Sequence, residues 1–194
     1  DFNYNPPQIL TNGAMCSSGG AGSICDTSGI LLFYTDGKDV YNKMHLLMKN
    51  GGSIGMSYQQ NGLIIPMPGS NKLYYIFTNS SNTTYGNYFS YSVVDISKQN
   101  GLGEVVSRSN FLMYNPTSKI TAVRHKNNTD VWVITHKNNS NTFCAFLLTG
   151  AGINKNPVLS NTGMVIPGSY YSFGSLKVSN DGNSLVDVIT RYGF

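Results

Sequence analysis

Short runs of apolar and β-branched residues, separated by turn-forming residues, dominate the chain. The runs cover residues 30–35, 72–78, 89–95, 120–125, 131–136, 142–149, 176–178 and 184–190. Residues 89–95 alternate apolar and polar side chains, the period of two expected of a half-buried strand. The best helical candidate, residues 43–49, is stopped by Asn50-Gly51-Gly52 and is too short to stand alone. The pattern predicts an all-β protein.

Three of the predicted strands follow one another closely. Residues 120–125, 131–136 and 142–149 are joined by polar turns of about five residues, which is the spacing of consecutive hairpins. We therefore expect an antiparallel meander in this part of the chain.

The predicted strands also recur along the chain. The strongest strand of each segment is centred on Leu32, Tyr75, Trp132 or Leu185, about 43 to 57 residues apart, and a turn rich in Asn, Asp or Gly precedes each. Four-stranded propeller blades recur at about 40–50 residues, and their tight hairpins need residues that tolerate positive φ. We expect a single β-propeller region over 1–194, with WD-type or YVTN-like antiparallel blades. A β-sandwich is the alternative, but it predicts no such repeat.

The expected blades span residues 22–60, 61–115, 116–165 and 166–194. The last has only two predicted strands, so the ring comprises about three and a half to four blades. Propellers typically need at least four blades to close. A small four-bladed ring with a degenerate last blade is one interpretation; we favour an incomplete ring in a chain that continues further. The start at Asp1, without Met, likewise predicts a processed or excised fragment.

Composition narrows the classes of function. Only 11% of the 194 residues are charged, whereas the chain holds 21 Gly and 13 Tyr, a composition that suits an extracellular all-β protein. The net charge of +4 comes from scattered basic residues, and a nucleic-acid interface needs a clustered basic footprint. No apolar run approaches the ~18 residues of a membrane helix. We expect neither nucleic-acid binding nor membrane insertion.

Candidate catalytic groups are few, and each has a structural interpretation. Asp36 and Asp39 are close in sequence, but short acids at turns usually hydrogen-bond their own backbone. Ser53 fits the G-x-S-x-G spacing of a nucleophile elbow, yet no helix follows it. His125 and His136 fall at opposite ends of a predicted hairpin, too far apart to share a metal. We predict no catalytic residue, no metal site and no cofactor; calcium at a turn such as Asp26 is the one cation considered.

The sequence contains three cysteines and allows two interpretations of Cys16 and Cys25. Cys16 and Cys25 flank a Gly-rich stretch, and a disulfide between them would close a short loop. The alternative is two small buried thiols. Cys144 then has no partner, so disulfides do not determine this fold.

Tyrosines in predicted loops are the best candidates for ligand contacts. Sugars are held by aromatic faces together with amide and hydroxyl hydrogen bonds, and these tyrosines lie beside Asn, Ser and Gln. The candidate ligand-binding residues are Tyr58, Tyr85, Tyr88, Tyr170 and Tyr171. The alternative is that Tyr simply covers the surface of a low-charge β protein.

Several strings resemble one family in the right order along nearly the whole chain. They include GILLFYTDG at residues 29–37, IPMPG at 65–69, DVWVITH at 130–136 and LKVSNDG at 176–182. This is similar to the propeller-like N-terminal region of large secreted proteins of Bacteroidetes, especially flavobacteria, which end in a sorting domain of the type IX secretion or gliding-motility kind. Two departures affect turns: Cys25 stands where Ser is usual, and Asn180 replaces a Pro. The resemblance implies export to the cell surface and carries over no catalytic residue.

Together these observations predict a non-catalytic binding or adhesion module of a secreted or cell-surface bacterial protein. The expected partner is a protein or a glycan, and glycan binding is the most plausible ligand chemistry. A structural module for protein–protein contacts in an extracellular assembly is the alternative. A propeller-type glycoside-active enzyme is the least favoured.

Overall fold

The structure is a computed structural model and consists almost entirely of antiparallel strands, which confirms the all-β class. Its one helical element among the described residues is a single 3₁₀ turn, Gln99–Gly101. None of the helical structure described is long and apolar enough to cross a membrane. The structure describes residues 5–6, 9, 11–17, 19–56, 62–82, 86–166, 174–179 and 181–189.

Two antiparallel sheets form the N-terminal half. Sheet A has the order β1-β2-β3, and sheet B has the order β4-β5-β6-β7. The strands of sheet A are β1 (Gly22–Cys25), β2 (Leu31–Thr35) and β3 (Val40–Asn42). Those of sheet B are β4 (Leu63–Pro66), β5 (Leu73–Asn82), β6 (Gly86–Asp95) and β7 (Glu104–Tyr114).

Two further sheets form the C-terminal half. Sheet C has the order β11-β10-β9-β8, with β12 also paired to β10, and sheet D is the pair β13-β14. The strands of sheet C are β8 (Pro116–Arg124), β9 (Val131–Lys137), β10 (Thr142–Thr149), β11 (Gly152–Ile153) and β12 (Val158–Asn161). Those of sheet D are β13 (Gly174–Val178) and β14 (Leu185–Ile189). The pairing of β8, β9 and β10 confirms the predicted meander.

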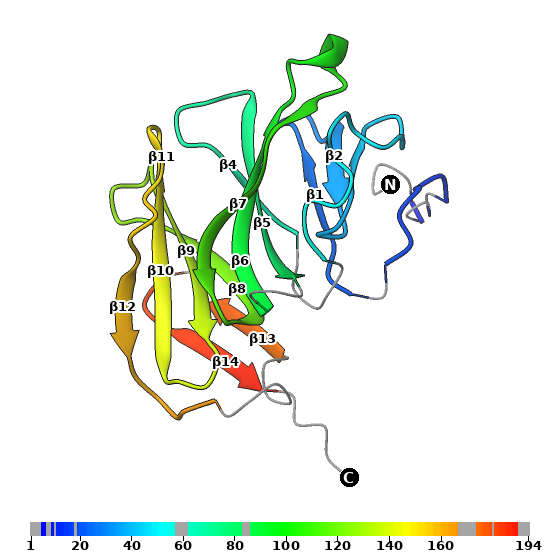
Figure 1. Ribbon diagram of the computed structural model, residues 1–194. Coiled ribbons are helices and arrows are strands. Elements are labelled where there is room, and N and C mark those ends of the chain that lie inside the picture. Colours follow the sequence, from blue (N-terminus) through cyan, green and yellow to red (C-terminus); the bar gives the residue numbers. More distant parts are fainter. Residues whose placement is uncertain are drawn as a thin grey trace.

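Sheet B lies between sheets A and C, and both of its faces are buried (Figure 1). Tyr74 and Ile76 of β5 pack toward sheet A, whereas the alternate residues Tyr75 and Phe77 pack toward sheet C. A strand covered on both faces needs apolar residues at consecutive positions. This double burial explains the unbroken apolar run of β5.

The prediction that residues 89–95 form a half-buried strand is wrong. Ser90 and Ser92 are fully buried on the face of β6 that packs toward sheet A, because sheet A covers that face. Their hydroxyls are satisfied inside: Ser90 Oγ lies 3.3 Å from Thr78 Oγ1, and Ser92 Oγ accepts a 3.0 Å hydrogen bond from the Ser109 N–H. The serines of the alternating pattern therefore form a buried layer of hydroxyl groups between sheets A and B. They do not face solvent.

Sheet D is joined to sheet C by a buried ion pair. β13 packs against β8, and the Lys119 ammonium of β8, which is 0% exposed, contacts the Asp187 carboxylate of β14. His136 is also buried beside this pair, with its ring edge-on to Phe143 at 4.5 Å between centroids. Burial lowers the pKa of His136; the Asp187 charge opposes this shift, and the Lys119 charge adds to it. Burial therefore favours the neutral form of the imidazole next to the pair.

We predict that Asp187→Asn lowers the free energy of unfolding by about 3–5 kcal/mol, because it leaves a buried ammonium without a counter-charge. The double variant Lys119→Met/Asp187→Leu should recover most of this loss, since no charge then remains buried. Urea denaturation followed by fluorescence measures both. The control is Lys49→Met at the exposed Lys49–Glu104 pair, which should cost at most about 1 kcal/mol. Equal losses in Asp187→Asn and the control would contradict the buried pair.

Candidate functional site

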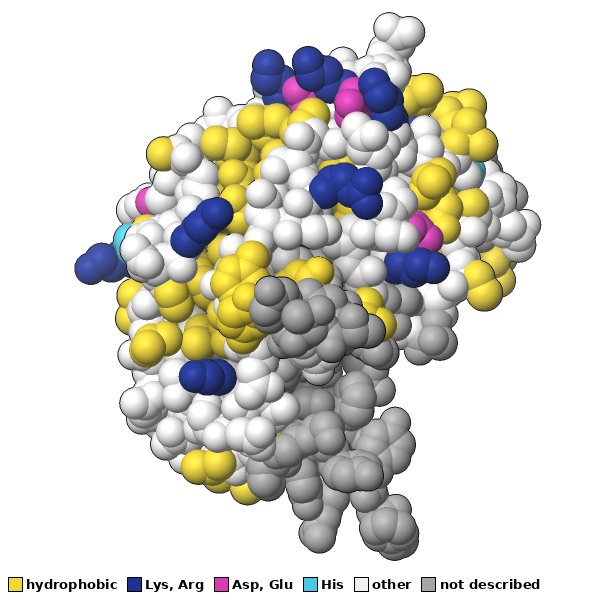
Figure 2. Space-filling view, viewed as in Figure 1, with side chains coloured by type: hydrophobic (Ala, Val, Ile, Leu, Met, Phe, Trp, Pro, Cys, Tyr) yellow, Lys and Arg dark blue, Asp and Glu magenta, His cyan; other side chains and the backbone are white. Residues whose placement is uncertain are grey.

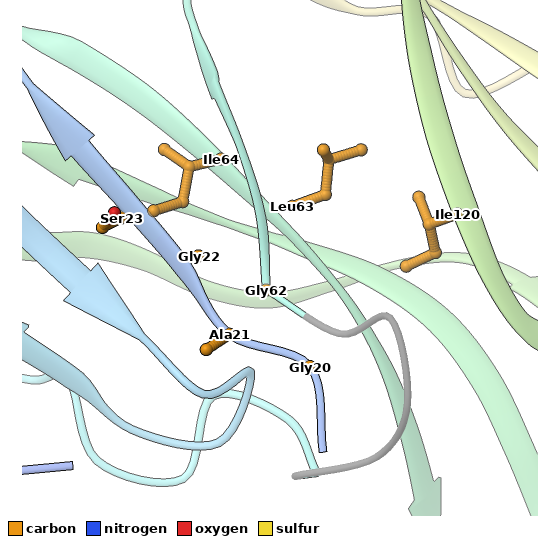
Figure 3. Close-up of a pocket in the computed structure, with 8 residues that line it drawn as sticks. All are labelled: Gly20, Ala21, Gly22, Ser23, Gly62, Leu63, Ile64 and Ile120. Carbon is orange, nitrogen blue, oxygen red and sulfur yellow. The ribbon is translucent and has the colours of Figure 1, made fainter. Parts of the chain in front are cut away.

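The first strands of three successive sheets converge on one cavity. β1, β4 and β8 surround it, and its volume is about 490 Å³. Figure 3 shows the Leu63 and Ile120 side chains in the space between β4 and β8, with Ile64 on the side of β4 toward β1. We call this the central cavity, and its lining residues are Gly20, Ala21, Gly22, Ser23, Gly62, Leu63, Ile64 and Ile120.

The lining of the central cavity carries little chemistry. Its side chains are aliphatic apart from the hydroxyl of Ser23, and none of the lining residues titrates. Its glycines have a packing role: a Cβ on Gly22 would lie 2.2 Å from the carbonyl oxygen of Gly62. β1 and β4 approach this closely only because residue 22 has no side chain.

We predict that Gly22→Ala lowers the free energy of unfolding by about 1–3 kcal/mol, the usual cost of overpacking. The neighbouring backbone has to move, since the clashing atom is a carbonyl oxygen. Gly13→Ala is the matched control, because a Cβ there meets no atom within 4 Å, and it should change stability by less than about 0.5 kcal/mol. Thermal and urea unfolding measure the difference. Equal stability of the two variants would rule out the close approach of β1 and β4.

A second cavity has richer chemistry and opens between sheets B and C. Its volume is about 500 Å³, within the range of about 300–1,000 Å³ that is usual for small-molecule sites. It is formed by the end of β7, the last residue of β9, and parts of β10 and β12. We call it the B–C groove, and its lining residues are Met113, Tyr114, Asn115, Lys137, Thr142, Cys144, Pro157, Leu159 and Asn161.

Strand register places the polar groups of the groove on one face of sheet C. Thr142 pairs with Asn161, and Cys144 pairs with Leu159, so these four side chains project to the same side. Cys144 also pairs with Thr135, two residues before Lys137, so Lys137 lies on this face as well. The same face packs onto sheet B through Phe146 and Val133. The groove is therefore the open end of the B–C interface.

Hydrogen bonds fix the polar lining. Thr142 Oγ1 donates to Asn161 Oδ1 at 2.8 Å, which engages the carbonyl oxygen of this amide and leaves its N–H groups as donors. Asn115 has a left-handed φ of 57°. Its N–H donates to the Asn87 carbonyl, and its own carbonyl accepts from the Asn138 N–H, both at 2.8 Å. Asn115 thus ties the end of β7 to both sheets.

An exposed aromatic cluster adjoins the groove. Phe111 and Tyr114 are 42% and 51% exposed, and their ring centroids lie 4.4 Å apart. Tyr88 is half-buried, 6.4 Å from Phe111. A bulge between β6 and β7, where Phe89 pairs with Met113 and Ser90 with Phe111, breaks the strand alternation. It allows Phe111 and Tyr114 to touch on the face of sheet B that also carries Tyr88 and Ser90, at the rim of the groove. In Figure 2 hydrophobic side chains gather over β7, β10 and β12.

The structure places one of the five predicted tyrosines at this cluster. Tyr88 lies beside Phe111, and Tyr114, its partner in the β6–β7 pairing, lines the groove. The other four lie outside the described residues: Tyr58, Tyr85, Tyr170 and Tyr171. Sequence reasoning missed Phe111 and Tyr114, although their flanking Asn110 and Asn115 give the same pairing of aromatic and amide that selected the tyrosines.

The remaining sequence candidates have local structural roles. Asp36 Oδ1 accepts from the N–H groups of Lys38 and Asp39, which confirms the turn interpretation. The Ser53 N–H donates to Asp39 Oδ1 in a turn, with φ of 55° at Ser53. Nδ1 of His125 accepts from the Asn127 N–H at its turn. Within the described part of the chain, no three His, Cys, Asp or Glu side chains are grouped to hold a metal ion.

The cysteines are free thiols. Cys16 and Cys25 are exposed, so the alternative of two buried side chains is wrong for both. Cys144 is buried in the floor of the B–C groove. Burial raises the pKa of the Cys144 thiol, and the nearby Lys137 charge acts against this shift. Lys137 and Cys144 line the same groove.

Comparisons with protein-family models, with curated proteins and with solved structures find no significant match to this chain. Assignment of function therefore depends on the chemistry of the cavities. The central cavity offers backbone and aliphatic surface. The B–C groove offers amides, a hydroxyl and a cation, and the exposed aromatic cluster lies at its rim; together these suit a polar ligand with apolar faces.

Proposed function

We propose that the four sheets are successive blades of a β-propeller. Each sheet is built from strands consecutive in sequence, and the first strands β1, β4 and β8 gather around the central cavity. β13, the first strand of sheet D, packs against β8 in turn. Radial repetition of small antiparallel sheets around a common channel is the propeller plan. No sheet of the described residues closes on itself, and the two strands of sheet D fit an incomplete ring.

On this scaffold the best-supported function is non-catalytic glycan binding, and the exposed Phe111–Tyr114 pair beside the B–C groove is the observation that carries it. A sugar ring presents apolar C–H faces, which stack on aromatic rings, and hydroxyls, which bond to amides and hydroxyls. Tyr114 supplies the first kind of contact. Asn161 and Thr142 supply the second.

The proposed setting is the surface of a bacterial cell or the extracellular space. The resemblance to secreted propeller regions of Bacteroidetes supports export, and a low-charge surface rich in Gly and Tyr is compatible with it. Binding of a surface glycan by such a module would serve adhesion.

A protein–protein role is the second candidate, because sheet D exposes an aliphatic face. Val186 and Val188 of β14 are 57% and 53% exposed, and they alternate with Asp187, which points toward Lys119. Exposed apolar patches commonly mark contacts with another protein. This candidate places the contact on sheet D, none of whose residues lines the groove.

We predict that the protein binds oligosaccharides and that Tyr114→Ala weakens this binding about tenfold, equivalent to about 1.4 kcal/mol. The substitution removes the aromatic face on which the sugar would stack. Because Tyr114 is half exposed, we expect it to change the fold little. A glycan array selects the ligand, and isothermal titration calorimetry measures the dissociation constant. Phe111→Ala should weaken binding in the same direction.

The control is Leu47→Ala, which removes a side chain of similar exposure outside the groove and should leave binding unchanged. Absence of binding to any array glycan would reject the proposal in favour of the protein-contact alternative. Release of new reducing ends from a bound glycan would instead identify an enzyme.

A further inference from the structure

Among the described residues that line the B–C groove, one carries a charge, and it is positive. Lys137 is exposed at the end of β9 and lines the groove. It lies two residues after Thr135, the partner of Cys144, and so on the face of sheet C that lines the groove. Within the described residues, the ion pairs join Lys38, Lys49 and Lys119 to acids, and Lys137 makes none.

No acidic side chain in the described part of the chain neutralises this charge. No Asp or Glu lines the groove, and every described carboxylate is engaged elsewhere in a hydrogen bond or an ion pair. These carboxylates are Asp26, Asp36, Asp39, Asp95, Glu104, Asp130, Asp181 and Asp187. A concave site lined by one sign of charge attracts ligands of the opposite sign. The groove is therefore electrostatically suited to an anion.

The cation and the aromatic ring are held in fixed relation. Tyr114 precedes Asn115, and Lys137 precedes Asn138, and the 2.8 Å hydrogen bond from the Asn138 N–H to the Asn115 carbonyl joins these two positions. The second bond of Asn115, to Asn87, anchors the same segment to sheet B. Because the backbone sets this spacing, Tyr114, at the end of the edge strand β7, and Lys137 stay close together at the rim of the groove without a folding rearrangement on binding.

We infer that the B–C groove selects anionic oligosaccharides, with a sugar ring on Tyr114 and its acidic group beside Lys137. This rests on the proposed glycan-binding function and specifies its ligand class. Asn161, whose carbonyl oxygen is engaged by Thr142, directs amide donors to the sugar hydroxyls or to the acid. A lysine recognises an anion as a point charge, so a carboxylate of a uronic acid and a sulfate ester both satisfy this chemistry.

Calorimetric titration of the whole chain with matched oligosaccharides tests the inference. The ligands are a galacturonic acid tetrasaccharide, its methyl ester, a neutral galactose tetrasaccharide and the sulfated form of the latter. We expect the acid, the sulfated sugar or both to bind at least tenfold more tightly than the uncharged partner of the same backbone. The difference should shrink between 0.05 M and 0.5 M NaCl, because salt screens an exposed charge.

Variants assign the effect to the groove. Lys137→Met should abolish the preference for the anionic sugar and keep the weaker binding of the neutral one, while Lys137→Arg should retain the preference. Lys98→Met, at another exposed lysine outside the groove, should behave as the unmodified chain. Circular dichroism and the thermal midpoint show whether each variant is folded.

The outcomes separate this inference from the proposed function. Equal affinity for charged and uncharged sugars, with weakening by Tyr114→Ala, would overturn the anionic selectivity and leave glycan binding standing. Lack of binding to every sugar would overturn both. A preference that survives in Lys137→Met would refute the role of the groove, and equal binding of tetraglutamate would replace the sugar with an acidic peptide.

Discussion

Burial of both faces of sheet B is the constraint on which the rest of the structure depends. Phe33 of sheet A packs edge-on against Tyr74 at 5.5 Å between centroids, and Phe89 packs against Phe146 of sheet C at 5.8 Å. A small sheet cannot bury enough apolar surface alone, so each sheet is stable only against its neighbour. Sheet D also depends on its neighbour: β13 packs against β8 of sheet C, and the Lys119–Asp187 ion pair adds an ionic contact.

Face-to-face packing of this kind also creates the central cavity and the B–C groove. Where the first strands converge, close approach at Gly22 leaves a space lined by backbone and aliphatic groups. Where the outer strands of sheets B and C diverge, the core ends and the polar ends of β7, β9 and β10 face each other across the B–C groove. The same interface therefore supplies both the stability of the fold and the geometry proposed to bind a ligand.

The sequence predicted the all-β class and most strand positions, because the length of an apolar run indicates the length of a strand and the Gly or Asn turns indicate where it ends. It failed at Ser90 and Ser92, since periodicity cannot distinguish a solvent-facing hydroxyl from one buried beneath another sheet. The groove was beyond prediction for a related reason: Tyr114, Lys137 and Asn161 meet only through the pairing of distant strands. Of the five tyrosines predicted to bind a ligand, only Tyr88 lies in the described part of the chain, and it lies next to that site.

Mapping a bound ligand by NMR tests the central claim most directly. Titration of the isotope-labelled chain with an anionic oligosaccharide should shift amide resonances at residues 113–115, 137, 142–144 and 157–161, the lining of the B–C groove. Shifts confined to residues 20–23, 62–64 and 120, the lining of the central cavity, would contradict the account, because they would place the ligand where no charged group and no aromatic ring is available.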